Sequence, residues 1–327
     1  NKEESRYARM IYAAIILLFI LSARLFYMQV VEGSYYKEEA DGNRIRSIPV
    51  QATRGVMYDR NGVILAGSRP AYSVIMPVDR KGNTLSDDEL QKLSVLLKMP
   101  VADLKKKIED NKRAFGAIYL ANDVGVDVAT QIEEKKDDFP GIQIEVNPLR
   151  VYPLGAAGAQ VLGYVGEAGP DDKDADGNPY TTATLIGRAG IERKYNQYLE
   201  GKNGSKTIEV NASGQPVGYV GGTPAVSGNN IRLTLDANLQ KAAEDAIDSQ
   251  VKILAKSGIY ATGASAVAID PNSGAVLAMV SEPSYDPNRF SKGMSTADWN
   301  QIINNKNHPM QNRTIASMYP PGSLFKV

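Results

Sequence analysis

The residues best placed to do chemistry lie near the end of the sequence, where Ser323 is followed three positions later by Lys326. Pro320 and Pro321 cannot continue a helix, so a new helix is predicted to begin at Gly322 and Ser323. Free N–H groups and the dipole at a helix N-terminus favour a developing negative charge. Lys326 would lie one turn further on the same face, where a partly neutral amine could take the hydroxyl proton. This spacing predicts a serine nucleophile with a lysine base.

The S-x-x-K pattern is weak by itself, because residues 34–37 (SYYK) match it as well. Residues 227–229 (SGN) and 256–258 (KSG) match S-x-N and K-[ST]-G, two patterns that accompany S-x-x-K in one class of serine enzymes, but both precede Ser323. We interpret all three as chance matches. The assignment of Ser323 therefore depends on the residues around it.

The composition excludes several other chemistries. The 37 Lys and Arg residues balance 37 Asp and Glu residues, so the strong positive field of nucleic-acid-binding proteins is missing and we expect no nucleic-acid partner. The absence of cysteine excludes disulfides, thiolate nucleophiles and Cys-ligated metals. His308 is the only histidine. It could serve as a base for Ser323, but Lys326 already lies at i+3, so we expect a structural role for His308.

An apolar run at residues 10–31 predicts a transmembrane anchor. Its 22 residues match the ~20 that a helix needs to cross the hydrocarbon core, provided that Arg24 snorkels to the interface. A cleavable signal peptide, with Ser22 and Ala23 near the cleavage point, is the alternative. Lysines and arginines flank both ends almost evenly, so the short N-terminal side alone favours a cytoplasmic segment at residues 1–9.

The rest of the 327 residues predicts an α+β fold with two domains. In the first, residues 32–235, the Asn61-Gly62 turn predicts a hairpin, Ser86 and Glu89 form a capping box, and Pro100 opens a second helix. In the second, residues 236–327, Asp236 caps a helix, and a nearly all-apolar hairpin at residues 264–280 is typical of the buried centre of a sheet. The apolar face expected on that helix consists of Leu239, Ala243, Ala246, Ile247 and Val251.

Two charged groups could be mistaken for functional sites. Asp172, Asp174 and Asp176 before Gly177 resemble the opening of a calcium loop, but Ala183 stands where the closing Glu is needed, so we predict no metal and no cofactor. Arg54 and the pair Asp59-Arg60 could form a catalytic pair. Beside an N-G turn, we expect them to brace two subdomains instead.

Several motifs together resemble those of class B penicillin-binding proteins. They cover almost the whole chain: RGVMYDRNG at 54–62, RVYP at 150–153, LGYVG at 162–166, G-x-x-GIE with Tyr195, LEG and Gly204 at 187–204, LTLD at 233–236, DP with Gly274 at 270–274, YDPN at 285–288, NR at 312–313 and YPPGS at 319–323. Gln160 stands where histidine is usual in that family. The run EVNASG at 209–214 points to the elongation type, penicillin-binding protein 2, and the division type is the alternative.

This resemblance implies a membrane-anchored peptidoglycan D,D-transpeptidase: an anchor, a mixed α/β pedestal and the N-terminal part of a transpeptidase domain. Ser323 would attack the penultimate D-Ala of a stem peptide, with Lys326 as the acylation base, and beta-lactams would acylate Ser323 in the same way. The implied location is the bacterial cell membrane, with the bulk of the chain extracytoplasmic. An alternative function is that the pedestal is a scaffold that docks and activates a RodA-like glycosyltransferase among other elongation-complex proteins. A beta-lactam sensor or a beta-lactamase would lack this long pedestal.

In that family the S-x-N and K-[ST]-G motifs follow S-x-x-K, whereas this sequence ends one residue after Lys326. Those motifs supply a second proton-relay pair, an oxyanion donor and the strand that binds the substrate carboxylate. We therefore expect the sequence to be a piece of a longer enzyme, and the 327 residues alone to be inactive.

Overall fold

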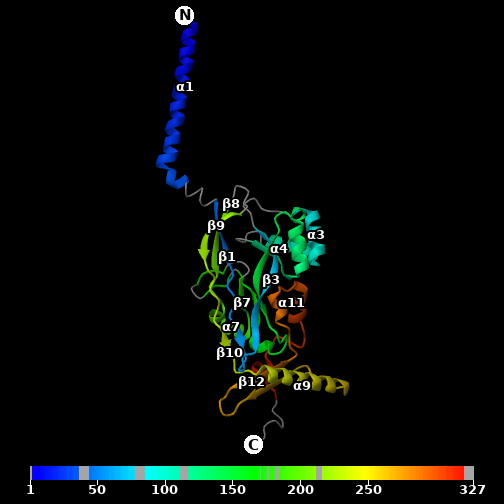
Figure 1. The fold of residues 1–327 in the computed structure, drawn as a ribbon. Coiled ribbons are helices and arrows are strands. Elements are labelled where there is room, and N and C mark those ends of the chain that lie inside the picture. The colour runs from blue at the N-terminus through cyan, green and yellow to red at the C-terminus, as the bar shows by residue number, and fades with distance from the viewer. Residues whose placement is uncertain are drawn as a thin grey trace. The chain divides into compact units, whose positions relative to one another are not determined.

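The computed structural model describes residues 2–36, 44–77, 85–110, 117–169, 171–174, 177–180, 184–210 and 216–319 (Figure 1). The chain divides into two compact units. Unit 1 consists of residues 1–50 and 204–224, and unit 2 of residues 51–203 and 225–327. The domain boundaries predicted at 31/32 and 235/236 are based on changes in the residue pattern along the sequence. They stay predictions.

Unit 1 contains the apolar helix and a small antiparallel sheet. Helix α1 (Lys2–Phe26) continues into the π-helical turn η1 (Tyr27–Val31). The span Met10–Val31 has a mean hydropathy of 2.1 and none of it is buried, which fits a membrane span and equally a signal sequence. The sheet has the order β1-β8-β9, formed by β1 (Ile45–Val50), β8 (Gly204–Val210) and β9 (Pro216–Thr223).

Unit 2 is built on a five-stranded sheet. Its order is β10-β2-β3-β4, and β5 also pairs with the long strand β3; the strands are β2 (Met57–Tyr58), β3 (Ile64–Pro77), β4 (Ala117–Val124), β5 (Gln143–Val151) and β10 (Ile231–Arg232). The hairpin predicted at Asn61-Gly62 is confirmed, because β2 and β3 pair antiparallel around it. Gly62 has φ +89°, a conformation that favours glycine.

Helices cover one part of this sheet and enclose an apolar core. They are α3 (Asp87–Leu97), α4 (Val101–Asp110), α5 (Val126–Glu134) and the 3-10 turn η2 (Lys136–Asp138) (Figure 1). The predicted capping box is confirmed, since Ser86 accepts the N–H of Glu89 while the Glu89 carboxylate accepts the N–H of Ser86. The core between helices and sheet includes Val74, Leu93, Leu104, Leu120 and Ile132.

A second core joins residues on both sides of position 235. Met57, Leu65, Tyr152 and Leu199 pack in one cluster with Leu235 and Ala237. Short elements surround this cluster: α6 (Ala159–Leu162), β6 (Val165–Glu167), β7 (Leu185–Gly187), α7 (Gly190–Lys194) and α8 (Asn196–Leu199). The antiparallel pair β6-β7 forms a separate two-stranded sheet.

The last part of unit 2 contains the long helix α9 (Ala237–Lys256) and the hairpin of β11 (Ala264–Ile269) and β12 (Val276–Glu282), followed by α10 (Asn288–Ser291), α11 (Thr296–Ile303) and α12 (Arg313–Ala316). Asp236 caps α9 as predicted, accepting the N–H groups of Asn238 and Leu239. The helix is attached to the hairpin by a polar residue, because Gln240 bonds both the N–H and the C=O of Met279.

The apolar residues predicted on one face of α9 are half-buried to exposed, with Leu239 39% exposed, and Ala237 and Gln240 are the buried positions of the helix. One expectation for this region differs from the structure. The hairpin forms, but it is not a buried centre. Within the described ranges β11 pairs only with β12, and Val267 and Ile269 are 43% and 56% exposed.

Candidate functional site

The predicted nucleophile and base, Ser323 and Lys326, lie outside the described residues, which end at Tyr319. Their separation and surroundings are therefore not given by the structure. The structure does describe the elements that precede them, which are the hairpin β11-β12 and the short helix α12. Helix α12 ends seven residues before Ser323, and these elements are called the frame below.

Helix α12 is tied to β12 by its first residues. Asn312 caps it by accepting the N–H of Thr314, and the N–H of Arg313 donates to Ser281 Oγ over 3.1 Å. Ser281 Oγ in turn donates to the carbonyl oxygen of Gln311 over 2.9 Å. The buried guanidinium of Arg313 donates to the carbonyl oxygens of residues 307 and 308. The segment before the S-x-x-K motif is thus held on a strand rather than only by chain connectivity.

Gln160 of α6 connects this frame to the pedestal. Its buried Nε2 donates to the carbonyl oxygens of Pro309, at 2.9 Å, and of Ser281, at 3.0 Å. The carbonyl of Pro283 lies 3.4 Å away. An amide supplies the two N–H donors that these carbonyls need, so glutamine can occupy the position where the family usually has histidine. One side chain therefore holds both β12 and the loop that leads to α12.

Two further side chains join the pedestal to residues that follow position 235. Asn288 bonds both the N–H and the C=O of Tyr152, at 2.8 and 3.0 Å. Glu244 of α9 accepts the N–H of Gly158 over 2.7 Å, and burial raises the pKa of Glu244. These bonds bridge more than 80 positions in sequence, so no local signal predicts them.

A buried charge cluster lies in the pedestal. The Glu192 carboxylate accepts from Arg54 Nε at 2.6 Å and from Arg150 Nε at 2.7 Å. The Tyr152 hydroxyl also donates to it, at 3.1 Å, and burial together with Glu192 raises the pKa of that tyrosine. Arg150 donates further to the carbonyl oxygen of Gly55. Removing either charge of a buried pair leaves the other uncompensated, so this cluster fixes how its segments pack.

The partner of Arg54 differs from the expected brace. Asp59 does not pair with it; instead Asp59 accepts the N–H groups of Asn61 and Val63, both at 2.7 Å, and of Ala237 at 3.1 Å. Asp59 thus fastens the turn to the start of α9. Glu192 belongs to the GIE motif, but nothing in its local sequence shows which arginine it meets.

The remaining predicted positions do not gather into a site. Asp172 accepts from Arg188 and from the N–H of Gly169, both at 2.7 Å, and Asp174 accepts from Asn178. Asp176 and Ala183 lie outside the described residues. No metal-binding group of three acidic or histidine side chains occurs in the part of the chain that the structure describes. The side chain of His308 is exposed, and its carbonyl oxygen accepts from Arg313.

Comparison with known protein families shows which family the chain belongs to. The Penicillin-binding Protein dimerisation domain matches residues 49–233, and the Penicillin binding protein transpeptidase domain matches residues 264–327. The chain belongs to the penicillin-binding protein family. The α+β fold with its two parts is thereby confirmed, and the S-x-x-K motif falls inside the matched transpeptidase segment.

Individual penicillin-binding proteins are similar over nearly the whole chain. Peptidoglycan D,D-transpeptidase MrdA of Escherichia coli K12 is 34% identical over 320 residues, covering 95% of this chain and 48% of that protein. MrdA of Acinetobacter baumannii is 32% identical over 314 residues, covering 95% and 45%. The solved complex between penicillin-binding protein PBP2 and MreC from Helicobacter pylori matches with a TM-score of 0.64 and 27% identity, covering 86% of this chain and 50% of that one.

These matches confirm the resemblance to the elongation type, penicillin-binding protein 2. The chain spans about half the length of the curated relatives it matches.

Proposed function

We propose that the full-length protein is a membrane-anchored peptidoglycan D,D-transpeptidase. The observation that carries this proposal is the match, over 95% of the chain, to relatives named peptidoglycan D,D-transpeptidase, together with Ser323 and Lys326 in S-x-x-K spacing inside the transpeptidase segment. The bonds from Gln160 and Ser281 to the segment before this motif support it, because a nucleophile must be held in place to react.

The proposed reaction has two steps. Lys326 takes the hydroxyl proton as Ser323 Oγ attacks the carbonyl carbon of the penultimate D-Ala in a stem peptide. The peptide bond to the terminal D-Ala breaks, the proton goes to the leaving amine, and an acyl-serine ester remains. An amine of a neighbouring stem peptide then attacks the ester, which forms the cross-link and returns the proton to Ser323. Beta-lactams would acylate the same serine.

Release of D-Ala tests this reaction. Full-length protein supplied with a stem pentapeptide and an acceptor amine should release D-Ala and form the cross-linked product, while Ser323→Ala should do neither. Undiminished D-Ala release by the Ser323→Ala protein would contradict the proposal.

The apolar span Met10–Val31 supports a place in the bacterial cell membrane. We propose that residues 32 onward are extracytoplasmic. A second role is proposed for the pedestal: docking and activation of a RodA-like glycosyltransferase. A neighbouring structure favours a docking role, because the Helicobacter pylori penicillin-binding protein is in a complex with MreC. Full-length Ser323→Ala protein should still co-purify with a RodA-like glycosyltransferase from detergent. Loss of co-purification in this inactive protein would contradict a docking role that is independent of catalysis.

A further inference from the structure

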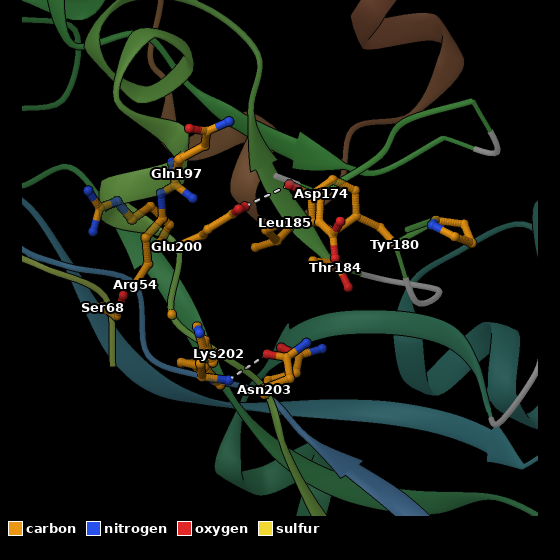
Figure 2. Close-up of a pocket in the computed structure, with 16 residues that line it drawn as sticks. Arg54, Ser68, Asp174, Tyr180, Thr184, Leu185, Gln197, Glu200, Lys202 and Asn203 are labelled. Atoms are coloured by element: carbon orange, nitrogen blue, oxygen red, sulfur yellow. Dashed lines mark hydrogen bonds between the residues drawn. The ribbon is translucent and has the colours of Figure 1, made fainter. Parts of the chain in front are cut away.

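A pocket opens in unit 2 between segments that the transpeptidase chemistry does not use. Its volume is about 420 Å³, within the ~300–1,000 Å³ typical of small-molecule sites. The wall comes from the segment before β2, from β3 and β5, from the loop before β7, and from residues that follow α8. Figure 2 shows Arg54 and Ser68 on one side of this pocket and Asp174 and Tyr180 on the other.

One wall of the pocket has an excess of positive charge. Arg54 and Arg150 line it, and their shared partner Glu192 supplies one carboxylate for two guanidinium groups. Arg54 Nη1 and Arg150 Nη2 are buried, and neither has a hydrogen-bond partner within the described ranges. A net buried charge of +1 remains beside the pocket. Because a low-dielectric surround screens charge weakly, this wall attracts an anion.

Lys202 adds a free cation to the pocket. Its backbone is fixed on both sides, since its N–H and C=O bond the C=O and N–H of Val226 at 2.8 and 2.9 Å. Its side chain is exposed, and its ammonium has no ion pair among the residues the structure describes. The ammonium can therefore reach a ligand while the main chain that carries it stays in place.

Acceptors line another part of the pocket. Glu200 Oε2 accepts from the Tyr180 hydroxyl at 2.8 Å (Figure 2). It also accepts from Asn196 Nδ2 at 2.6 Å, which leaves the other carboxylate oxygen for a ligand. Burial and the Glu200 carboxylate raise the pKa of Tyr180, so this hydroxyl remains a donor and Glu200 remains the acceptor. Asp174 contributes a second carboxylate to this side.

The charges around the pocket add to zero but are separated. Arg54, Arg150 and Lys202 give three positive charges, and Glu192, Glu200 and Asp174 give three negative ones. Arg54, Arg150 and Lys202 with Glu192 leave two positive charges at one end, and Glu200 and Asp174 give two negative charges at the other, which would repel a phosphate dianion. A neutral ligand with a carboxylate at one end and an ammonium at the other fits both parts.

We infer that this pocket binds a short zwitterionic peptide, with its carboxylate toward Arg54, Arg150 and Lys202 and its ammonium toward Glu200. The inference goes beyond the proposed transpeptidase reaction, because it rests on pedestal residues and requires no activity of Ser323. The carboxylate neutralises the buried excess charge, and Lys202 donates to it directly. Glu200 accepts from the ammonium through its free oxygen.

Calorimetric titration of the 327-residue chain in detergent tests the inference with three matched peptides. Triglycine has both charged ends, triglycinamide lacks the carboxylate, and N-acetyltriglycine lacks the ammonium. Triglycine should bind saturably, and each of the other two should bind at least roughly tenfold more weakly, since a charge-assisted hydrogen bond is worth about 1.5–3 kcal/mol and 1.4 kcal/mol is tenfold. Equal affinities for the three peptides, or no saturable heat with triglycine, would overturn the inference.

Variants then locate the bound peptide. Lys202→Gln should weaken triglycine roughly tenfold, whereas Lys256→Gln, the same charge change at the exposed end of α9, should leave it unchanged. Glu200→Gln should weaken triglycine but not N-acetyltriglycine. Both pocket changes keep the main-chain bonds, and matching circular dichroism spectra check that the variants fold. Equal effects of Lys202→Gln and Lys256→Gln would place binding elsewhere and defeat the inference.

Discussion

Gln160 and Pro309 lie 149 positions apart and are joined by a hydrogen bond of 2.9 Å. Through the same amide group Gln160 also holds the carbonyl oxygen of Ser281, whose hydroxyl accepts the N–H of Arg313. A continuous set of bonds therefore runs from the pedestal to the helix that precedes the predicted nucleophile. Residues of the pedestal and the orientation of Ser323 are expected to depend on each other.

Replacing Gln160 tests this connection. Gln160→Leu removes both donors and leaves buried carbonyl groups unsatisfied, which should lower the free energy of unfolding by about 2 kcal/mol. In the full-length protein it should also slow acylation of Ser323 roughly tenfold, the equivalent of about 1.4 kcal/mol in the barrier. Gln160→His keeps a donor and should recover most of the acylation rate. Stopped-flow labelling with a fluorescent penicillin measures the rate.

A structural effect alone would make a different pattern. If Gln160→Leu lowered stability but left the acylation rate at that of the unaltered protein, the connection to Ser323 would be wrong. The exposed Gln197→Leu is the matched control and should change neither quantity.

The charge cluster around Glu192 predicts a large effect on stability. Glu192→Gln leaves the buried guanidinium groups of Arg54 and Arg150 without a carboxylate, so the free energy of unfolding should fall by about 3–5 kcal/mol. Urea denaturation measures this difference. Glu134→Gln, at an exposed position of α5, should change it by less than about 0.5 kcal/mol. Similar small decreases in the free energy of unfolding for both variants would show that the cluster contributes little to stability.

Asp59 predicts a pH dependence. Burial acts to raise its pKa and three backbone N–H groups act to lower it, and the net pKa is lowered. A carboxyl group with a lower pKa in the folded state stabilises the fold above its unfolded pKa and loses this stabilisation as the pH falls through the folded pKa. Asp59→Asn should therefore be less stable than the unaltered chain at pH 7, and the difference should narrow below about pH 4.

Urea denaturation at pH 7 and at about pH 3 measures both differences. The exposed Asp137→Asn serves as control and should show a small difference at either pH. If the difference in free energy of unfolding between Asp59→Asn and the unaltered chain stayed constant or increased on acidification, the role assigned to the three N–H donors would be contradicted.

The span Met10–Val31 is predicted to stay attached as an anchor. N-terminal sequencing of the full-length protein extracted from membranes should find residues that precede the span. A mature N-terminus near Arg24 would identify a cleaved signal peptide instead.

Local signals in the sequence predicted local structure well. The Ser86–Glu89 capping box, the Asp236 cap and the Asn61-Gly62 turn each depend on a few neighbouring residues, and each is present. The partners of Arg54 and Gln160 lie more than 100 positions away, and their identity depends on packing that no short motif encodes. The burial of the apolar face of α9 could not be predicted for a related reason, because periodicity shows that a face is apolar but not what covers it.

The sequence predicted the reacting residues of the candidate site but not the residues that hold them in place. Spacing and flanking prolines singled out Ser323 and Lys326, and the resemblance to penicillin-binding proteins gave them a reaction, but their geometry lies outside the described residues. The frame that holds the preceding segment, with Ser281 and Arg313 at its centre, was missed. Its members are ordinary polar residues whose bonds are made only in the folded chain.

Acylation by penicillin tests the proposed reaction most directly. The full-length protein should be labelled by a fluorescent penicillin, and mass spectrometry of the digested adduct should place the label on the peptide that contains Ser323. Ser323→Ala should abolish labelling, and Lys326→Ala should slow it greatly because the hydroxyl loses its base. A Ser323→Ala protein that is labelled as fast as the unaltered one would contradict the assignment of Ser323 as the nucleophile.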